Sequence, residues 1–162
     1  MPELPEAEVV ARQLRVHLLS AQLNECWVGR ADIVREGLPT LSWYHGAVLE
    51  AVERYGKSVA LRFNKEDELR YVVAELGMTG LLLFRATQTK HPQHVHVRMS
   101  FTGGRESELR YWNPRRFGRL SLLDRAGLDR YRARRFGVDP LTVPRDEFVR
   151  LMQARRGRLK PL

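Results

Sequence analysis

The first residues of the chain combine an amine with two carboxyl groups, which is enough for covalent and acid–base chemistry. The small residue after Met1 normally permits removal of the initiator methionine, and Pro2 would then carry a free secondary amine. Such an amine has an unperturbed pKa of about 8, so a useful fraction is unprotonated near neutral pH. Its attack on an aldehyde-like carbon gives an iminium ion, which is permanently charged and therefore a strong electron sink. Glu3 adjoins the amine and Glu6 follows one helical turn later, so carboxyl groups stand ready to donate and accept protons.

The same stretch also has a purely structural interpretation, as the start of a helix. Pro5 suits the first helical position, and Glu6 and Glu8 suit the first turn through the helix dipole. Residues 5–19 are therefore predicted to form an amphipathic helix. Its apolar face would contain Val10, Leu14 and Leu18. This interpretation does not need proline at position 2 or glutamate at position 3, and these are the residues that the catalytic interpretation explains.

The positive charge of the chain is concentrated after residue 100. The formal net charge is +9; residues 1–100 contain 12 basic and 12 acidic side chains, whereas residues 101–162 contain 16 and 7. A basic segment on a neutral body favours a polyanionic partner, most often nucleic acid. The alternative is an arginine-rich composition on solvated helix faces.

Length and composition predict one sizeable domain, or one domain with an appendage. The chain has no signal-peptide pattern and no apolar run near the length of a membrane span. Its single cysteine, Cys26, excludes an internal disulfide and a cysteine-rich zinc site within these residues. We therefore expect a cytoplasmic protein with no membrane partner, and no metal or other cofactor held by this part of the chain.

After the first helix, short apolar stretches alternate with turn residues, which predicts a run of short strands. The expected strands are residues 24–35, 47–54, 57–63, 69–76, 81–85, 94–101 and 109–112. Two short helices are expected at residues 124–135 and 146–156. The expected fold class is mainly β with flanking helices: an antiparallel β-sandwich with an N-terminal α-helix and short C-terminal helices.

Three positions along these strands are candidates for contacts with DNA. Lys57 follows a glycine at a strand start, where its ammonium could reach a phosphate, although it could also be an ordinary surface lysine. Met78 stands at the tip of a glycine-flanked turn, residues 76–80, and either inserts into a partner or packs into the core. His94 lies on the polar face of the alternating strand 94–101 and is a further candidate.

A fourth stretch, residues 113–118, reads Asn-Pro-Arg-Arg-Phe-Gly and is predicted to be a loop. Arg115 and Arg116 can hydrogen-bond base edges and phosphates. Phe117 can wedge between base steps, and a plain basic loop would not require it.

Together these residues resemble the formamidopyrimidine-DNA glycosylase and endonuclease VIII family of base-excision-repair enzymes. The start, Met-Pro-Glu-Leu-Pro-Glu, is similar to the N-terminal signature of the formamidopyrimidine-glycosylase branch. Lys57, residues 76–80 and residues 114–118 fall at matching places and in matching order. Residues 137–141 weakly resemble the segment that leads out of the family's first domain, and residues 159–162 resemble the opening of its second domain.

The resemblance implies a DNA glycosylase with abasic-site lyase activity that removes oxidised or ring-opened purines from damaged double-stranded DNA. Pro2 would be the nucleophile that forms a Schiff base, and Glu3 would protonate the sugar ring oxygen. Glu6 would support the same site, and Lys57 would hold a phosphate next to the lesion. The resemblance also implies a monomer of bacterial type, located in the cytoplasm and associated with the nucleoid through DNA.

The resemblance further implies how the gap left by an everted base is filled. Met78, Arg115 and Phe117 would occupy it, with Arg115 facing the orphaned partner base. Arg116 would contact the DNA backbone. Chemistry at C1′ requires the nucleotide to be extruded, and the void then needs apolar, flat groups to maintain the stack.

The chain departs from the family pattern in two respects. Glu75 stands where the family usually has a phosphate-contacting histidine, and a carboxylate there would repel DNA or need a cationic partner. The family's second half, with its helix–two-turn–helix motif and usual four-cysteine zinc finger, is not found in these residues. We expect residues 1–135 to form the catalytic β-sandwich domain and residues 136–162 to form a linker and the start of the helical domain.

These departures lead to expectations for the isolated chain. It would be weak or inactive on duplex DNA, and it would be either a shortened form of a longer protein or a natural short relative. A non-catalytic nucleic-acid-binding module with the same fold is an alternative function, which Glu75 favours and the intact catalytic set opposes. A tautomerase-like enzyme would explain Pro2 as a general base but would not explain Phe117 beside two arginines.

Overall fold

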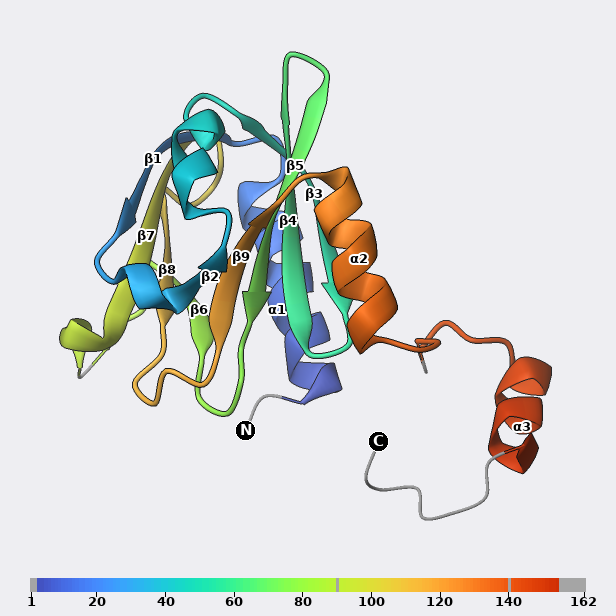
Figure 1. Cartoon of the computed structure of the whole chain (residues 1–162). Helices are drawn as coiled ribbons and strands as arrows, with labels where there is room; N and C mark the ends of the chain where they lie inside the picture. Colours follow the sequence, from blue (N-terminus) through green and yellow to red (C-terminus); the bar gives the residue numbers. More distant parts are fainter. Residues whose placement is uncertain (1–2, 90, 140, 155–162) are drawn as a thin grey trace.

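The computed structural model describes residues 3–89, 91–139 and 141–154 of the protein (Figure 1). Its elements follow in the order α1 (Leu4–Leu18), β1 (Gln22–Val28), η1 (Ala31–Ile33), β2 (Val34–Glu36), η2 (Leu38–Tyr44), β3 (Val48–Tyr55), β4 (Ser58–Lys65), β5 (Glu68–Glu75), β6 (Leu81–Phe84), η3 (Pro92–His94), β7 (Val95–Thr102), β8 (Glu108–Trp112), β9 (Arg119–Leu123), α2 (Arg125–Arg135) and α3 (Arg145–Ala154). Within this part of the chain, no helix has both the length and the apolar character that crossing a membrane requires.

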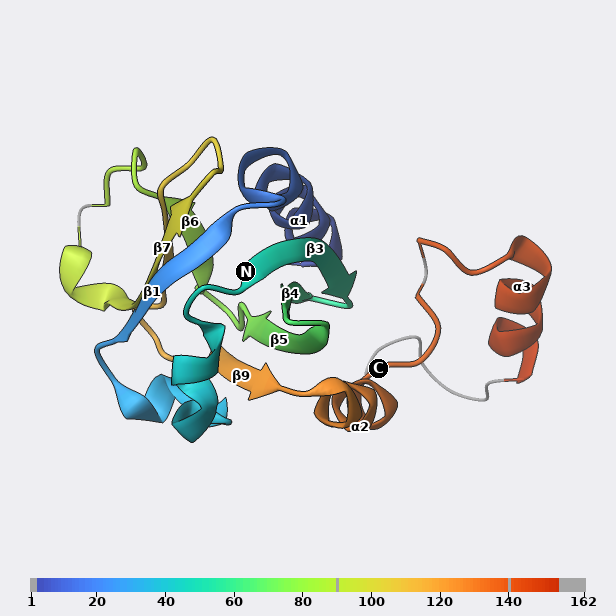
Figure 2. The same ribbon diagram turned by 90° about the horizontal axis from the view of Figure 1, so that it is seen from above.

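The strands of the described chain form one nine-stranded sheet, in the order β2-β9-β5-β4-β3-β1-β7-β8-β6. Neighbouring strands are antiparallel, except that β2 and β9 are parallel. In the middle of this order β1 and β3 pair at their first residues, Gln22 and Val48. The sheet turns at this junction, so that β1 and β6 to β8 lie on one side and β3 to β5 with β9 on the other (Figure 2).

The two halves of the sheet and α1 share one hydrophobic core. At its centre Phe63 of β4 stacks on Phe101 of β7, with ring centroids 6.5 Å apart. Both rings are buried. Since these rings come from opposite halves, the expected β-sandwich with an N-terminal helix is confirmed, with its two sheets joined along one edge.

Helix α1 is started by a reciprocal cap and held by small side chains. The backbone N–H of Glu3 donates to Glu6 Oε2 at 3.0 Å, while the Glu3 side chain accepts from the Glu6 backbone N–H. This is a capping box, which satisfies donors that the first turn would otherwise leave unpaired. The helix packs on β3 and β4. Its buried side chains are Ala7, Ala11, Leu14 and Leu18. The predicted apolar face is thus confirmed at the two leucines, whereas Val10 is half-buried.

Helix α2 covers the other face of β5 and β9. Asp124 caps it, because its Oδ1 accepts from the Gly127 N–H at 2.7 Å. A second, smaller apolar cluster lies beneath the helix and contains Ala60, Tyr71, Val73, Leu123, Leu128 and Tyr131. Helix α3 lies apart from the sandwich, and none of its residues is buried (Figure 1).

Two segments differ from the sequence-based expectation. Residues 24–35 are not one strand: after β1 the chain turns through η1, where Arg30 Nε donates to Asp32 Oδ1 at 2.9 Å, before it enters β2. Strand β9 was not expected from the sequence. Its residues 120–123 are all buried, Ser121 included, because the core covers one face of the strand and α2 the other.

The shared core yields a stability prediction. Replacing Phe63 by alanine should lower the free energy of unfolding by about 3–5 kcal/mol, because the loss of a buried ring leaves a cavity between the two halves. Urea denaturation followed by tryptophan fluorescence measures this loss. Phe117→Ala is the control: its ring is 56% exposed, so the change should stay within about 0.5 kcal/mol. Equal losses in the two variants would contradict the shared core.

Candidate active site

The segments that contain the predicted site residues gather at one end of the sandwich. In Figure 1 the start of α1, the β3–β4 turn, the β5–β6 loop and the β8–β9 loop all lie at the lower end. In that order they carry Glu3 with Glu6, Lys57, Met78 and residues 115–117. The antiparallel topology thus brings residues from four distant parts of the chain to one surface.

A carboxylate–ammonium pair lies at the start of α1. Lys57 Nζ is 2.5 Å from Glu3 Oε2, and their side chains are 53% and 44% exposed. The pair is therefore accessible to a ligand, and the N-terminal end of the helix favours the negative charge of the carboxylate. Glu6 accepts the Glu3 backbone N–H, so the structure brings Glu3, Glu6 and Lys57 together. Pro2, the predicted nucleophile, lies outside the described residues.

The β5–β6 and β8–β9 loops pack backbone against backbone. A Cβ atom on Gly77 would lie 2.5 Å from Gly118 N, and one on Gly118 would lie 2.2 Å from the carbonyl oxygen of Glu75. Gly77 also has φ = +60°, in the left-handed region that glycine adopts at little cost. Both glycines are thus required for the close contact that holds the two loops side by side.

The tips of these two loops present apolar side chains to solvent. Met78 is 38% exposed and Phe117 is 56% exposed. The Arg115 guanidinium carbon lies 4.9 Å from the centroid of the Phe117 ring, in cation–π contact. The structure therefore does not place Met78 in the core, which was the alternative interpretation of this turn. The neighbouring Arg116 pairs instead with Asp32, with its NH1 4.0 Å from Asp32 Oδ2.

Asn113 organises the β8–β9 loop, and the sequence did not single it out. It is fully buried. Its Nδ2 donates to Tyr111 Oη at 3.0 Å and to the Gly118 carbonyl at 3.2 Å, and its Oδ1 accepts the Arg116 N–H at 3.0 Å. Tyr111 in turn donates to the Glu75 carbonyl at 2.7 Å, which connects this network to the β5–β6 loop. The one available signal was asparagine before proline, a turn-forming pair.

Glu75, the residue that departs from the family pattern, has two arginine partners. Its Oε2 lies 3.1 Å from Arg35 NH2 and its Oε1 lies 2.9 Å from Arg135 NH1, and its side chain is 13% exposed. Burial raises the pKa of Glu75, and the nearby charge of Arg35 opposes this rise. A carboxylate at this position was expected either to repel DNA or to need a cationic partner. The structure shows cationic partners, Arg35 and Arg135.

His94 lies neither in the carboxylate–ammonium pair at the start of α1 nor in the two exposed loops. Its ring centroid lies 5.8 Å from that of His91 and 6.2 Å from that of Trp112. Its carbonyl accepts the Asn113 N–H at 2.9 Å, so its backbone supports the β8–β9 loop, while DNA binding by its side chain stays a prediction. In the described part of the chain, no grouping of three or more His, Cys, Asp or Glu side chains could hold a metal ion.

The fold and this surface define a class of protein: a mainly β domain with an acid–base cluster at its N-terminal helix and, at the same end, two exposed loops, of which the β8–β9 loop carries arginines. A family model described as the formamidopyrimidine-DNA glycosylase N-terminal domain matches residues 1–120. The chain belongs to this family.

Relatives in the family are longer than this chain. The formamidopyrimidine-DNA glycosylase of Herpetosiphon aurantiacus is 32% identical over 168 residues, which cover 99% of this chain and 59% of the relative. The enzyme of the same name from Thermomicrobium roseum is 35% identical over 174 residues, which cover 96% of this chain and 58% of the relative. The chain thus spans somewhat more than half the length of these curated relatives.

Solved structures have the same fold. A complex of inhibited LlFpg with DNA containing N7-benzyl-Fapy-dG aligns with a TM-score of 0.69 at 23% identity, over 82% of this chain and 48% of that one. Lactococcus lactis Fpg with DNA containing an abasic site aligns with a TM-score of 0.68 at 22% identity, again over 82% and 48%. At these identities the likeness establishes the fold.

The contact between the two loops can be tested by adding one methyl group. Gly118→Ala should lower the free energy of unfolding by about 1–3 kcal/mol, because the new Cβ meets backbone atoms that cannot move aside. Gly137→Ala is the matched control, since nothing lies within 4 Å of a Cβ at that position. Thermal unfolding of both variants compares them, and a Gly118→Ala variant as stable as the control would contradict the packed loops.

Proposed function

We propose that this chain is the catalytic part of a base-excision-repair DNA glycosylase with abasic-site lyase activity. Its substrate is damaged double-stranded DNA that contains oxidised or ring-opened purines. The observation that carries the proposal is the position of Glu3: next in sequence to Pro2, capped by Glu6 and 2.5 Å from Lys57. The family of the chain and the names of its relatives support the same function.

In the proposed reaction the amine of Pro2 forms a bond to C1′ of the damaged nucleotide, and the bond from C1′ to the base breaks. The base leaves with the bonding electron pair and takes up a proton from solvent. The Glu3 carboxylate takes the proton from the amine and gives it to the sugar ring oxygen, so the ring opens and an iminium ion forms at C1′. This cation makes the 2′ proton acidic, and removal of that proton expels the 3′ phosphate by β-elimination.

The neighbours of Glu3 have supporting roles in this reaction. Glu6 fixes the backbone of Glu3 through the capping box, so that the carboxyl group keeps its position at the helix start. Lys57 holds a phosphate next to the lesion; its half-exposed ammonium can exchange the Glu3 carboxylate for a phosphate oxygen. Both acceptors are anionic and both suit a lysine ammonium.

The two exposed loops serve the extrusion of the nucleotide. Met78 and Phe117 enter the space that the everted base vacates, and Arg115 faces the orphaned base. The cation–π contact between Arg115 and Phe117 orients both side chains before DNA binds. Arg116 and His94 contribute contacts to the DNA backbone.

The proposal also assigns the organisation of the chain. Residues 1–135 form the catalytic domain. Residues 136–162 belong to the linker and the start of the second, helical domain, and of these, residues 140 and 155–162 lie outside the described part of the chain. The protein works as a monomer. Because the substrate is DNA, it acts in the cytoplasm of a bacterial-type cell, where it meets the nucleoid.

The covalent step predicts trapping by borohydride. Wild-type protein should form a reduced adduct with abasic single-stranded DNA, and Pro2→Gly should weaken the trapping. Glu3→Gln should slow it by about 100-fold or more, because a positioned acid–base group contributes 10²–10⁴-fold. Glu25→Gln, a change at an exposed carboxylate of β1, is the control and should trap normally. Equal trapping by a form whose Pro2 amine is blocked would eliminate Pro2 as the nucleophile.

The charge distribution predicts weak, salt-sensitive DNA binding by residues 1–162 alone. The dissociation constant should be micromolar or weaker at physiological salt, with a slope of about 0.9 per neutralised phosphate in a log–log plot against salt. Discrimination between damaged and intact duplex should be small, because extruding a base costs a few kcal/mol. Fluorescence anisotropy at several salt concentrations measures both quantities, and tight, lesion-selective duplex binding would contradict the prediction.

A further inference from the structure

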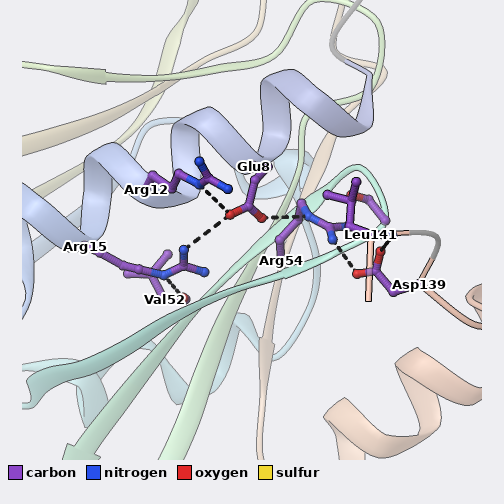
Figure 3. Close-up of polar contacts among 8 residues, drawn as sticks. Glu8, Arg12, Arg15, Val52, Arg54, Asp139 and Leu141 are labelled. Atoms are coloured by element: carbon purple, nitrogen blue, oxygen red, sulfur yellow. Dashed lines mark hydrogen bonds and ion pairs between the residues drawn. The ribbon is translucent and has the colours of Figure 1, made fainter. Parts of the chain in front are cut away.

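A buried arginine connects three segments next to the proposed site. The side chain of Arg54, in β3, is 4% exposed. Its Nε donates to Glu8 Oε2 at 3.0 Å and its NH2 donates to Asp139 Oδ2 (Figure 3). Its NH1 donates to the carbonyl oxygen of Gly56 at 3.1 Å. Because the guanidinium is a rigid planar fork, these three acceptors are held in one fixed geometry.

The first contact fixes α1. Glu8 lies two residues after Glu6 of the capping box, and its other carboxylate oxygen pairs with Arg12 at 3.0 Å and Arg15 at 3.5 Å. Arg15 Nε also donates to the Val52 carbonyl of β3 at 2.7 Å. Arg54 and Arg15 therefore tie the helix that begins at Glu3 to the strand that leads to Lys57.

The second contact fixes the turn that presents Lys57. Gly56 directly precedes Lys57 and has φ = +55°. A Cβ atom on Gly56 would lie 2.7 Å from the Phe136 ring, so the residue just after α2 packs directly on this turn. Gly56 is thus held by Arg54 through its carbonyl and by Phe136 through its Cα.

The third contact brings in the segment that follows α2. Asp139 accepts the Leu141 N–H through Oδ1 at 3.0 Å and pairs with Arg54 through Oδ2. At the other end of the same segment, Arg135 pairs with Glu75, directly before the β5–β6 loop. Residues 135–139 are therefore anchored beside both groups of proposed site residues.

We propose that Arg54 and Asp139 are positioning residues for the reaction: through them, the segment after α2 sets the place of Lys57 relative to Glu3. Neither residue touches the substrate. A buried guanidinium that loses one acceptor is left with an uncompensated charge, so it must shift toward water or toward its remaining partners. Either shift moves Gly56 and with it Lys57. The catalytic consequence rests on the proposed function, whereas the coupling itself does not.

Hydrogen exchange on the full chain tests the coupling without DNA. Asp139→Asn keeps the oxygen that can accept from Leu141 but removes the charge opposite Arg54, and Arg54→Lys keeps the charge but removes the fork. Both variants should exchange amides in residues 55–58 about tenfold faster than wild type, because local opening becomes easier. Arg12→Gln is the control: it removes a partner of Glu8 whose side chain is 71% exposed and leaves Gly56 untouched. Exchange at 55–58 as slow as in wild type would overturn the coupling.

Single-turnover cleavage of abasic single-stranded DNA tests the catalytic consequence. In Asp139→Asn the rate at saturating protein should fall about tenfold, because a displaced Lys57 no longer holds its phosphate in the right place relative to Glu3. The dissociation constant for the strand should change much less than the rate, because Lys57 is one phosphate contact among several. If the variant melts at a lower temperature but cleaves at an unchanged rate, the Arg54–Asp139 pair only stabilises the fold, and the proposal is overturned. If wild-type protein shows no cleavage, the proposed function fails, and the exchange measurement still decides the coupling.

Discussion

The close packing of α1 against the sheet is the constraint on which the functional end of the molecule depends. Two of its four buried side chains are alanines, so the helix approaches β3 and β4 closely and has little freedom to slide or rotate. Its first turn therefore projects from the edge of the sandwich at a fixed place. The capping box then uses the same residues, Glu3 and Glu6, for folding and for the proposed chemistry. A site built on a packed helix keeps its geometry better than one built on loops alone.

The loops are made rigid by a different device, a direct contact between backbones. Gly77 and Gly118 bring the β5–β6 and β8–β9 loops together, and the buried amide of Asn113 satisfies the polar groups that this contact covers. The apolar side chains at the loop tips are thus exposed while their backbones are not free to move. Such preorganisation lowers the ordering entropy that would otherwise oppose the proposed insertion into DNA.

Local patterns in the sequence were sufficient to predict the N-terminal helix and most strands, because the spacing of apolar residues indicates which face of an element is buried. They failed at β9, where five residues are too short a stretch to give a clear pattern and where the polar Ser121 is buried like its apolar neighbours. They also failed at the polar residues that support the site. Arg54 lies 85 positions from Asp139, and Tyr111 lies 36 positions from Glu75, so nothing in either neighbourhood indicates a partner. Glu75 was the exception: its need for a cation followed from its charge, but the identity of the cations did not.

The structure also refines what the net charge of +9 means for DNA binding. Several arginines after residue 100 already have partners within the protein: Arg135 pairs with Glu75, Arg110 with Glu108, and Arg119 donates to the Gly118 carbonyl. Arg132 lies over the ring of Tyr55. The two arginines paired with carboxylates, Arg135 and Arg110, would release few counterions on DNA binding, because their charge is already compensated. Arg119 and Arg132 have uncharged partners and keep their positive charge. The charge of Glu108 is already subtracted in the formal charge of residues 101–162, whereas Glu75 lies outside this segment, so its pairing with Arg135 lowers the charge that the segment can direct at phosphates. The exposed arginines of the β8–β9 loop would then carry a larger share of the proposed DNA contact.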